Sequence, residues 1–150
     1  MKFPTDVFLS AIDDRKIYYF STTKINTDSP HHFICLKRTD NDILIMTCCT
    51  TQFDTIRKFV ESRSLPMETL VWISPDVKDI DNPFTEDTYV NCNNSLTYTI
   101  EEFRTMYDSE AVSYSGMISE SHYHQILIGI HRSPLIDNET KELIPSPDSL

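Results

Sequence analysis

The organisation of the chain rests on two short apolar runs, SPHHFICLK at residues 29–37 and ILIMTCCTTQ at residues 43–52. Between them lies a polar segment, Arg38-Thr39-Asp40-Asn41-Asp42, that is rich in residues favouring turns. Two apolar runs separated by a polar loop of about five residues are typical of a β-hairpin. The sequence therefore predicts a pair of antiparallel strands here.

Groups able to do chemistry gather at one end of this predicted hairpin. In an antiparallel pair, the start of one strand lies beside the end of the next. His31 and His32 open the first strand, and Thr50, Thr51 and Gln52 close the second. We therefore expect these five side chains to share one rim of a sheet.

The charge of the chain is unevenly distributed. A net charge of −10 argues against a general nucleic-acid binder, which needs a positive surface. Residues 64–120 hold eleven acidic residues against two basic ones, net −9, whereas residues 29–63 hold five basic against four acidic, net +1. We expect an anionic ligand to bind the hairpin half, and the acidic half to repel it or to attract a basic partner. The candidate substrate-binding residues are Lys37, Arg38, Arg57 and Lys58.

Composition excludes several classes of protein. The chain has only two glycines, too few for the Gly-rich loops of nucleotide-binding sites. No stretch approaches about eighteen apolar residues, and residues 1–6 lack the features of a signal peptide, so we expect neither a membrane span nor secretion. The four cysteines lack the paired spacing of zinc ligands. We expect reduced thiols in a cytoplasmic protein, with no metal and no cofactor.

Three further patterns predict helices. After Gln52, apolar residues recur on one helical face at Phe53, Ile56, Phe59 and Val60. Thr99-Ile100-Glu101-Glu102 has the T-x-x-E pattern of a capping box, which predicts a short helix over 99–107. Ser119 is placed to cap a helix that carries an apolar stripe and ends before Pro134.

Strand-like segments dominate the first half of the chain, at residues 16–20, 69–73 and 88–93 as well as in the hairpin. This order predicts one α+β domain over residues 1–136. We expect a small SH3-like β-barrel or a strongly bent antiparallel sheet, with two or three outer helices. Residues 137–150, which contain Pro145 and Pro147, are predicted to form a flexible tail.

The order of elements, together with several short motifs, resembles the PemK/MazF-like toxins of bacterial type II toxin–antitoxin systems over residues 16–136. The similar pieces are the strands at 17–19 and 33–36, the turn at 50–52, the helix at 97–106 and the motif Gly116-Met117-Ile118-Ser119 followed by Tyr123-x-x-Ile126. The chain differs from the family where His31-His32 replace an Arg-Pro pair, and where Lys16 or a neighbour replaces an opening glycine.

The resemblance implies an SH3-like barrel, usually a homodimer, that cleaves single-stranded RNA without a metal, inhibits growth and is neutralised by a partner antitoxin. Such cleavage needs a base, an acid and donors for the phosphate charge. Histidine suits acid–base work because its unperturbed pKa is about 6.5. The candidate acid–base residues are thus His31 and His32, with Thr50, Thr51 and Gln52 as donors.

Three alternatives remain open from the sequence. The histidine pair is also compatible with two solvated loop residues beside an ordinary strand. The protein is also compatible with a non-catalytic member of the same fold that acts as a protein-binding or regulatory module through its acidic face. A cysteine hydrolase would use Cys48 or Cys49 with one of the two histidines, and would need an environment that stabilises a thiolate.

Overall fold

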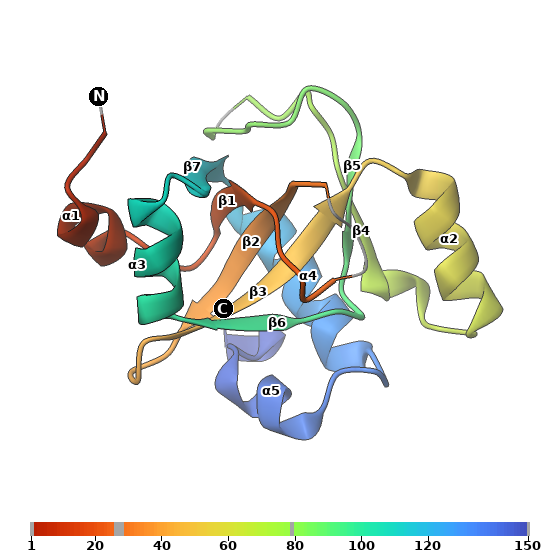
Figure 1. Ribbon diagram of the computed structural model, residues 1–150. Helices are drawn as coiled ribbons and strands as arrows, with labels where there is room; N and C mark the ends of the chain where they lie inside the picture. Colours follow the sequence, from red (N-terminus) through yellow and green to blue (C-terminus); the bar gives the residue numbers. More distant parts are fainter. Residues whose placement is uncertain (1, 26–28, 79, 150) are drawn as a thin grey trace.

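The computed structural model describes residues 2–25, 29–78 and 80–149. Over these residues the chain forms one antiparallel sheet of seven strands with five α-helices (Figure 1). The strands are β1 (Lys16–Phe20), β2 (His31–Arg38), β3 (Ile43–Thr50), β4 (Leu70–Ile73), β5 (Thr88–Asn91), β6 (Leu96–Thr99) and β7 (Val112–Met117). The helices are α1 (Thr5–Ser10), α2 (Phe53–Ser62), α3 (Ile100–Asp108), α4 (Glu120–Arg132) and α5 (Asn138–Leu143), with 3₁₀ turns η1 (Met67–Thr69) and η2 (Pro147–Ser149). The predicted α+β class is confirmed, but the described residues form five α-helices rather than the two or three expected.

The sheet is not closed into a barrel, so the expected SH3-like barrel is wrong. Its strand order is β4-β5-β3-β2-β1-β7, and β6 pairs with β3 outside this path. The two halves of β3 pair with different strands, because residues 43–46 pair with β6 and residues 49–50 pair with β5. Closure would require β4 and β7, at opposite ends of the order, to pair. Instead, a loop lies against β7, as described below.

The hairpin at the centre of the sheet is confirmed. Strands β2 and β3 pair antiparallel, with Phe33 opposite Cys48 and Ile34 opposite Thr47. Both strands are buried on both faces, which is why their apolar runs are almost unbroken. Along β2, Ile34 joins a buried cluster that contains the apolar face of α4, while Phe33 joins one that contains residues of α1 and α3. In Figure 1, α4 lies behind the sheet and α1 and α3 lie together at one end.

The predicted helix starts are confirmed. Helix α2 begins directly after Gln52. The capping box of α3 has both of its bonds, since the Thr99 hydroxyl accepts from the backbone N–H of Glu102 and the Glu102 carboxylate accepts from that of Thr99, each at 3.0 Å. At the start of α4, the Ser119 hydroxyl accepts from the backbone N–H of His122 at 3.1 Å.

The C-terminal segment packs against α4. The sequence predicts a flexible tail here, whereas the structure places α5 and a buried Ile144 in it. His124 and His131 of α4 donate from Nε2 to the carbonyls of Pro147 and Pro145, each at 3.0 Å. Two side chains of α4 therefore hold the backbone of this segment.

A loop segment between β4 and β5, residues 80–87, crosses to the far edge of the sheet; we call it the strap. The Asp81 carbonyl accepts a hydrogen bond from the Met117 N–H of β7 at 2.9 Å. Gly116 permits this approach: its φ is +151°, and a Cβ there would lie 2.2 Å from the Asp81 oxygen. The strap then buries Phe84 in the α4 cluster. Its path occupies the edge of β7 at Met117 and carries the strap to the site described next.

Candidate active site

Four strand ends meet along one side of the sheet. Tyr19 near the end of β1 pairs with His32 at the start of β2. Thr50 at the end of β3 pairs with Tyr89 near the start of β5. This arrangement confirms that the start of β2 and the end of β3 share one rim.

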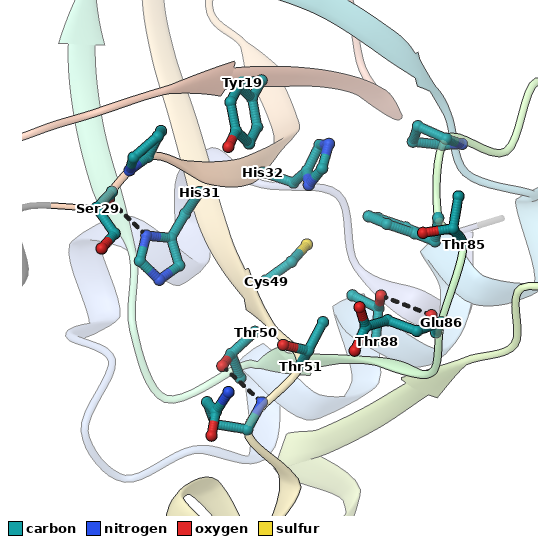
Figure 2. A pocket seen from close by; sticks show the side chains of 14 residues that line it. Tyr19, Ser29, His31, His32, Cys49, Thr50, Thr51, Thr85, Glu86 and Thr88 are labelled. Carbon is teal, nitrogen blue, oxygen red and sulfur yellow. Dashed lines mark hydrogen bonds between the residues drawn. The ribbon is translucent and has the colours of Figure 1, made fainter.

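A pocket of about 500 Å³ opens at this rim (Figure 2). Its lining includes all five predicted catalytic residues: His31, His32, Thr50, Thr51 and Gln52. The strap adds another wall, which includes Phe84 and Glu86. The rim pocket therefore brings the predicted acid–base and donor groups together around one space.

The two histidines belong to opposite faces of the sheet. Successive side chains of a strand alternate in direction. His32 lies on the same face as Ile34 and contacts Phe84 of the α4 cluster, whereas His31 lies on the face of Phe33. In Figure 2 the His31 ring lies on the side of Ser29 and Thr50, and the His32 ring lies beside Tyr19. The pocket extends around the start of β2. The two imidazole rings therefore lie on different sides of the pocket and do not stack on each other.

His32 lies half-buried between two aromatic rings. Its ring centroid is 4.8 Å from that of Tyr19 and 5.2 Å from that of Phe84. Burial, with a smaller contribution from the charge of His31, lowers the pKa of His32 below its usual value. No described residue hydrogen-bonds to its ring nitrogens. At neutral pH the His32 imidazole is therefore neutral and able to accept a proton from a ligand.

His31 has a defined hydrogen bond. Its Nδ1 lies 2.8 Å from the Ser29 carbonyl oxygen. Because a carbonyl only accepts, we assign the proton to Nδ1, which leaves Nε2 as the nitrogen that can exchange a proton with a ligand. When both ring nitrogens carry a proton, Nε2 can donate while Nδ1 stays bound to the Ser29 carbonyl.

Three donors accompany the histidines. The Thr50 hydroxyl oxygen accepts from the Gln52 backbone N–H at 3.1 Å, which leaves the hydroxyl hydrogen able to donate. The side chains of Thr51 and Gln52 form no hydrogen bond with any described residue, and Gln52 does not cap α2 with its side chain. These groups can therefore donate to negative charge that develops on a bound ligand.

The structure does not bring the predicted cations to the pocket. Lys37 and Arg38 lie at the far end of β2. Arg57 pairs with Asp54 and Glu61 along α2, at 3.5 and 3.4 Å. Lys58 is exposed on the same helix and does not line the pocket. Proximity in the sequence was therefore a poor guide to the position of the positive charge.

Sequence reasoning did not assign four residues to the site. Tyr19 and Phe84 hold the His32 ring, and Glu86 adds a carboxylate to the pocket. Arg63 lines a groove that adjoins the pocket. The place of Tyr19 beside His32 could have been inferred from the alternation of side chains along paired strands. Phe84, in contrast, lies in an irregular loop whose path no local pattern predicts.

The thiols near the pocket are poor nucleophiles. Burial raises the pKa of Cys48 to about 12 and that of Cys49 well above its usual value. Both thiols therefore stay protonated at neutral pH, and the thiolate that a cysteine hydrolase needs is not stabilised here.

No described set of three or more His, Cys, Asp or Glu side chains is arranged to hold a metal ion. Among the helices of the described residues, none has the length and apolar character needed to cross a membrane. Comparisons with known proteins identified no family: no family model matches this chain, and no curated protein matches it significantly.

Proposed function

We propose that this chain is a PemK/MazF-like toxin, an endoribonuclease that cleaves single-stranded RNA without a metal ion. The observation that supports it is the placement of His31 and His32 on two sides of one pocket that also contains Thr50, Thr51 and Gln52. In this proposal the protein is a cytoplasmic homodimer that stops growth, and a partner antitoxin neutralises it.

The two histidines have complementary roles in the reaction. His32, which is neutral at neutral pH, takes the proton of a ribose 2′-hydroxyl. The 2′-oxygen attacks the adjacent phosphorus, and the bond to the 5′-oxygen of the next nucleotide breaks. His31 donates a proton from Nε2 to that leaving oxygen, while Ser29 holds the ring through Nδ1. The products are a 2′,3′-cyclic phosphate and a 5′-hydroxyl, with one proton taken up and one released.

The donors at the end of β3 act on the phosphate. Negative charge grows on the non-bridging oxygens as the 2′-oxygen attacks. The hydroxyls of Thr50 and Thr51 and the amide of Gln52 line the pocket between the histidines and α2. Removing one such donor from an enzyme typically lowers the rate by about 10²–10³-fold.

The test is cleavage of a 5′-labelled single-stranded oligoribonucleotide by the purified chain in excess EDTA. We expect fragments that end in a 2′,3′-cyclic phosphate, and no fragments when every 2′-hydroxyl is methylated. Induced expression in bacteria should arrest growth, and co-expression of a neutralising neighbour gene should relieve the arrest. Intact RNA in both assays would overturn the proposal.

The second candidate is a non-catalytic protein-binding or regulatory module. The observation that favours it is the charge of the site, because no described residue that lines the rim pocket is Lys or Arg, while Glu86 is acidic. A module of this kind predicts that induced expression leaves growth and RNA intact, while the acidic 64–120 stretch binds a basic protein.

A further inference from the structure

A groove of about 660 Å³ adjoins the rim pocket on the His31 face of the sheet. It runs between α2 and the ends of β3 and β5, and the two spaces share His31, Thr50 and Gln52. A ligand bound at the histidines can therefore continue along the protein toward α2.

The groove contains a positive charge that the rim pocket lacks. Arg63 lies one residue beyond α2, and its guanidinium is 4.5 Å from the centroid of the Phe59 ring. Within the part of the chain that the structure describes, Arg63 forms no ion pair, unlike Arg57 of α2. The Arg63–Phe59 pair therefore presents a flat, cationic surface to the groove.

The rest of the groove combines apolar side chains with amides. Its lining includes Cys48 and Ile56 as well as Asn91 and Asn94. The Asn91 side-chain oxygen accepts from the Asn93 backbone and side chain, which leaves its own NH₂ group to donate. The Asn94 side chain has no hydrogen-bond partner among the described residues, so its oxygen and its NH₂ group are both available.

We infer that this groove is a subsite for one unpaired nucleobase of a single-stranded RNA. The base stacks against the Phe59–Arg63 pair, because aromatic and guanidinium planes accept the face of any base. Asn94 and Asn91 hydrogen-bond to the edge of the base, since side-chain amides match its donors and acceptors. The inference rests on the proposed function, because it places this base beside the phosphodiester that His31 and His32 flank.

The first experiment measures binding rather than cleavage. The probes are fluorescein-labelled eight-nucleotide 2′-O-methyl RNAs of A, C or U, which lack the hydroxyl needed for cleavage. Arg63→Gln should weaken binding about tenfold, the loss expected for one stacking and charge contact. Arg132→Gln is the matched control, since Arg132 is an exposed arginine on α4 that pairs with Glu68 at 3.4 Å. It should leave the affinity within about twofold of the wild type, because its charge lies outside both spaces.

The second experiment tests whether Asn94 recognises the hydrogen-bonding edge of the base. Asn94→Ala should change the ratios of the three affinities, because it removes the donor and acceptor that distinguish the bases. Asn41→Ala, in the exposed turn at the opposite end of the hairpin, should leave the ratios unchanged. Thermal unfolding of each variant checks that the fold is kept.

The outcomes separate the two proposals. If the RNA binds but Arg63→Gln behaves like Arg132→Gln and the ratios do not change, the groove is not a subsite and the cleavage proposal is unaffected. If binding depends on Arg63 but RNA stays intact in both the purified-chain assay and the expression assay, the groove binds RNA and the cleavage proposal is overturned. Absence of both binding and cleavage overturns both.

Discussion

The two ends of the β2–β3 hairpin use polar side chains in opposite ways. At the turn end, Arg38 donates to the carbonyls of Leu9 and Ile12 at 2.6 and 3.2 Å and pairs with Asp42 at 3.0 Å. At the rim end, the His32 ring and the side chains of Thr51 and Gln52 have no hydrogen bond to the described residues. At the turn end, Arg38 connects α1 to the sheet. At the rim end, these polar side chains line a pocket and remain available to a ligand.

This contrast shows that a charged residue close in sequence to a candidate site does not necessarily bind the ligand of that site. The Arg38 guanidinium already donates to the carbonyls of Leu9 and Ile12, so moving it to an anion would break both hydrogen bonds. The His32 ring and the side chains of Thr51 and Gln52 form no such hydrogen bonds with the described residues. The predictions below test this division of roles between the two ends.

The largest expected effect is on catalysis at the rim. His32→Ala and His31→Ala should each lower the rate of RNA cleavage by about 10²–10⁴-fold, because each removes an acid–base group. Measurements of the single-turnover rate and of the melting temperature should show lost activity with a retained fold. His122→Ala is the control, since His122 contacts Ser119 on α4 and lies outside the pocket. Full activity of both rim variants, with loss in His122→Ala, would move the site to α4.

The next effect is on stability at the turn end. Arg38→Met should lower the free energy of unfolding by about 2–3 kcal/mol, since two hydrogen bonds and an ion pair of a charged group are lost and the Ile12 carbonyl loses its partner. For a chain of this size that loss corresponds to a drop of about 4–12 °C in melting temperature. Lys37→Met is the matched control and should change the free energy by less than about 0.5 kcal/mol. Lower activity per folded molecule in Arg38→Met would contradict the division between the two ends.

A smaller effect is expected where the strap meets β7. Gly116→Ala should cost about 1–3 kcal/mol, because its φ of +151° is strained for alanine and the new Cβ would meet the Asp81 carbonyl. The strap should then separate from β7 at Met117 and expose Phe84. Chemical denaturation measures the loss, and protease cleavage within residues 80–87 measures the release. Ser115→Ala is the neighbouring control; equal protection of both variants would show that the strap is held elsewhere.

The smallest effect is the pH dependence of stability due to His32. Its pKa is lowered in the folded state, whereas the unfolded chain has the usual value of about 6.5. The unfolded state therefore binds more protons below pH 6.5, so stability is lost as the pH falls from about 6.5 toward the lowered pKa. The change in unfolding free energy between pH 7 and pH 5 should be smaller in His32→Gln than in the wild type. An equal change in both proteins would show that His32 does not titrate as proposed.

Local signals predicted part of the fold. The hairpin, the start of α2 and the capping box at Thr99 each depend on one short continuous stretch of sequence, and all are present. The sequence did not predict β6 and β7. Strand β7 reads Val112-Ser113-Tyr114-Ser115-Gly116-Met117, with weak alternation and a glycine, and it forms because β1 pairs with it from almost a hundred residues away.

Only the part of the site that follows from the direction of the paired strands was predictable from the sequence. Antiparallel pairing brings His31, His32 and Thr50 to one rim, whatever the rest of the chain does. The Phe84 wall and the Arg63 groove depend on the path of a loop and on the packing of α2 against the sheet. Contacts of this kind, between residues far apart in the chain, produce no periodic pattern in the sequence.

Burial on both faces gives β2 a further property. Segments with many buried contacts open only with the whole molecule, whereas loops open locally at much lower free energy. Amide protons of Phe33 to Leu36, all fully buried, should therefore exchange with solvent deuterium among the slowest in the chain, and those of the strap among the fastest. The rim pocket thus has one wall in the segment expected to exchange slowest and another in a loop expected to exchange faster. His31 and His32 should therefore keep their pairing with β1 when the strap opens locally.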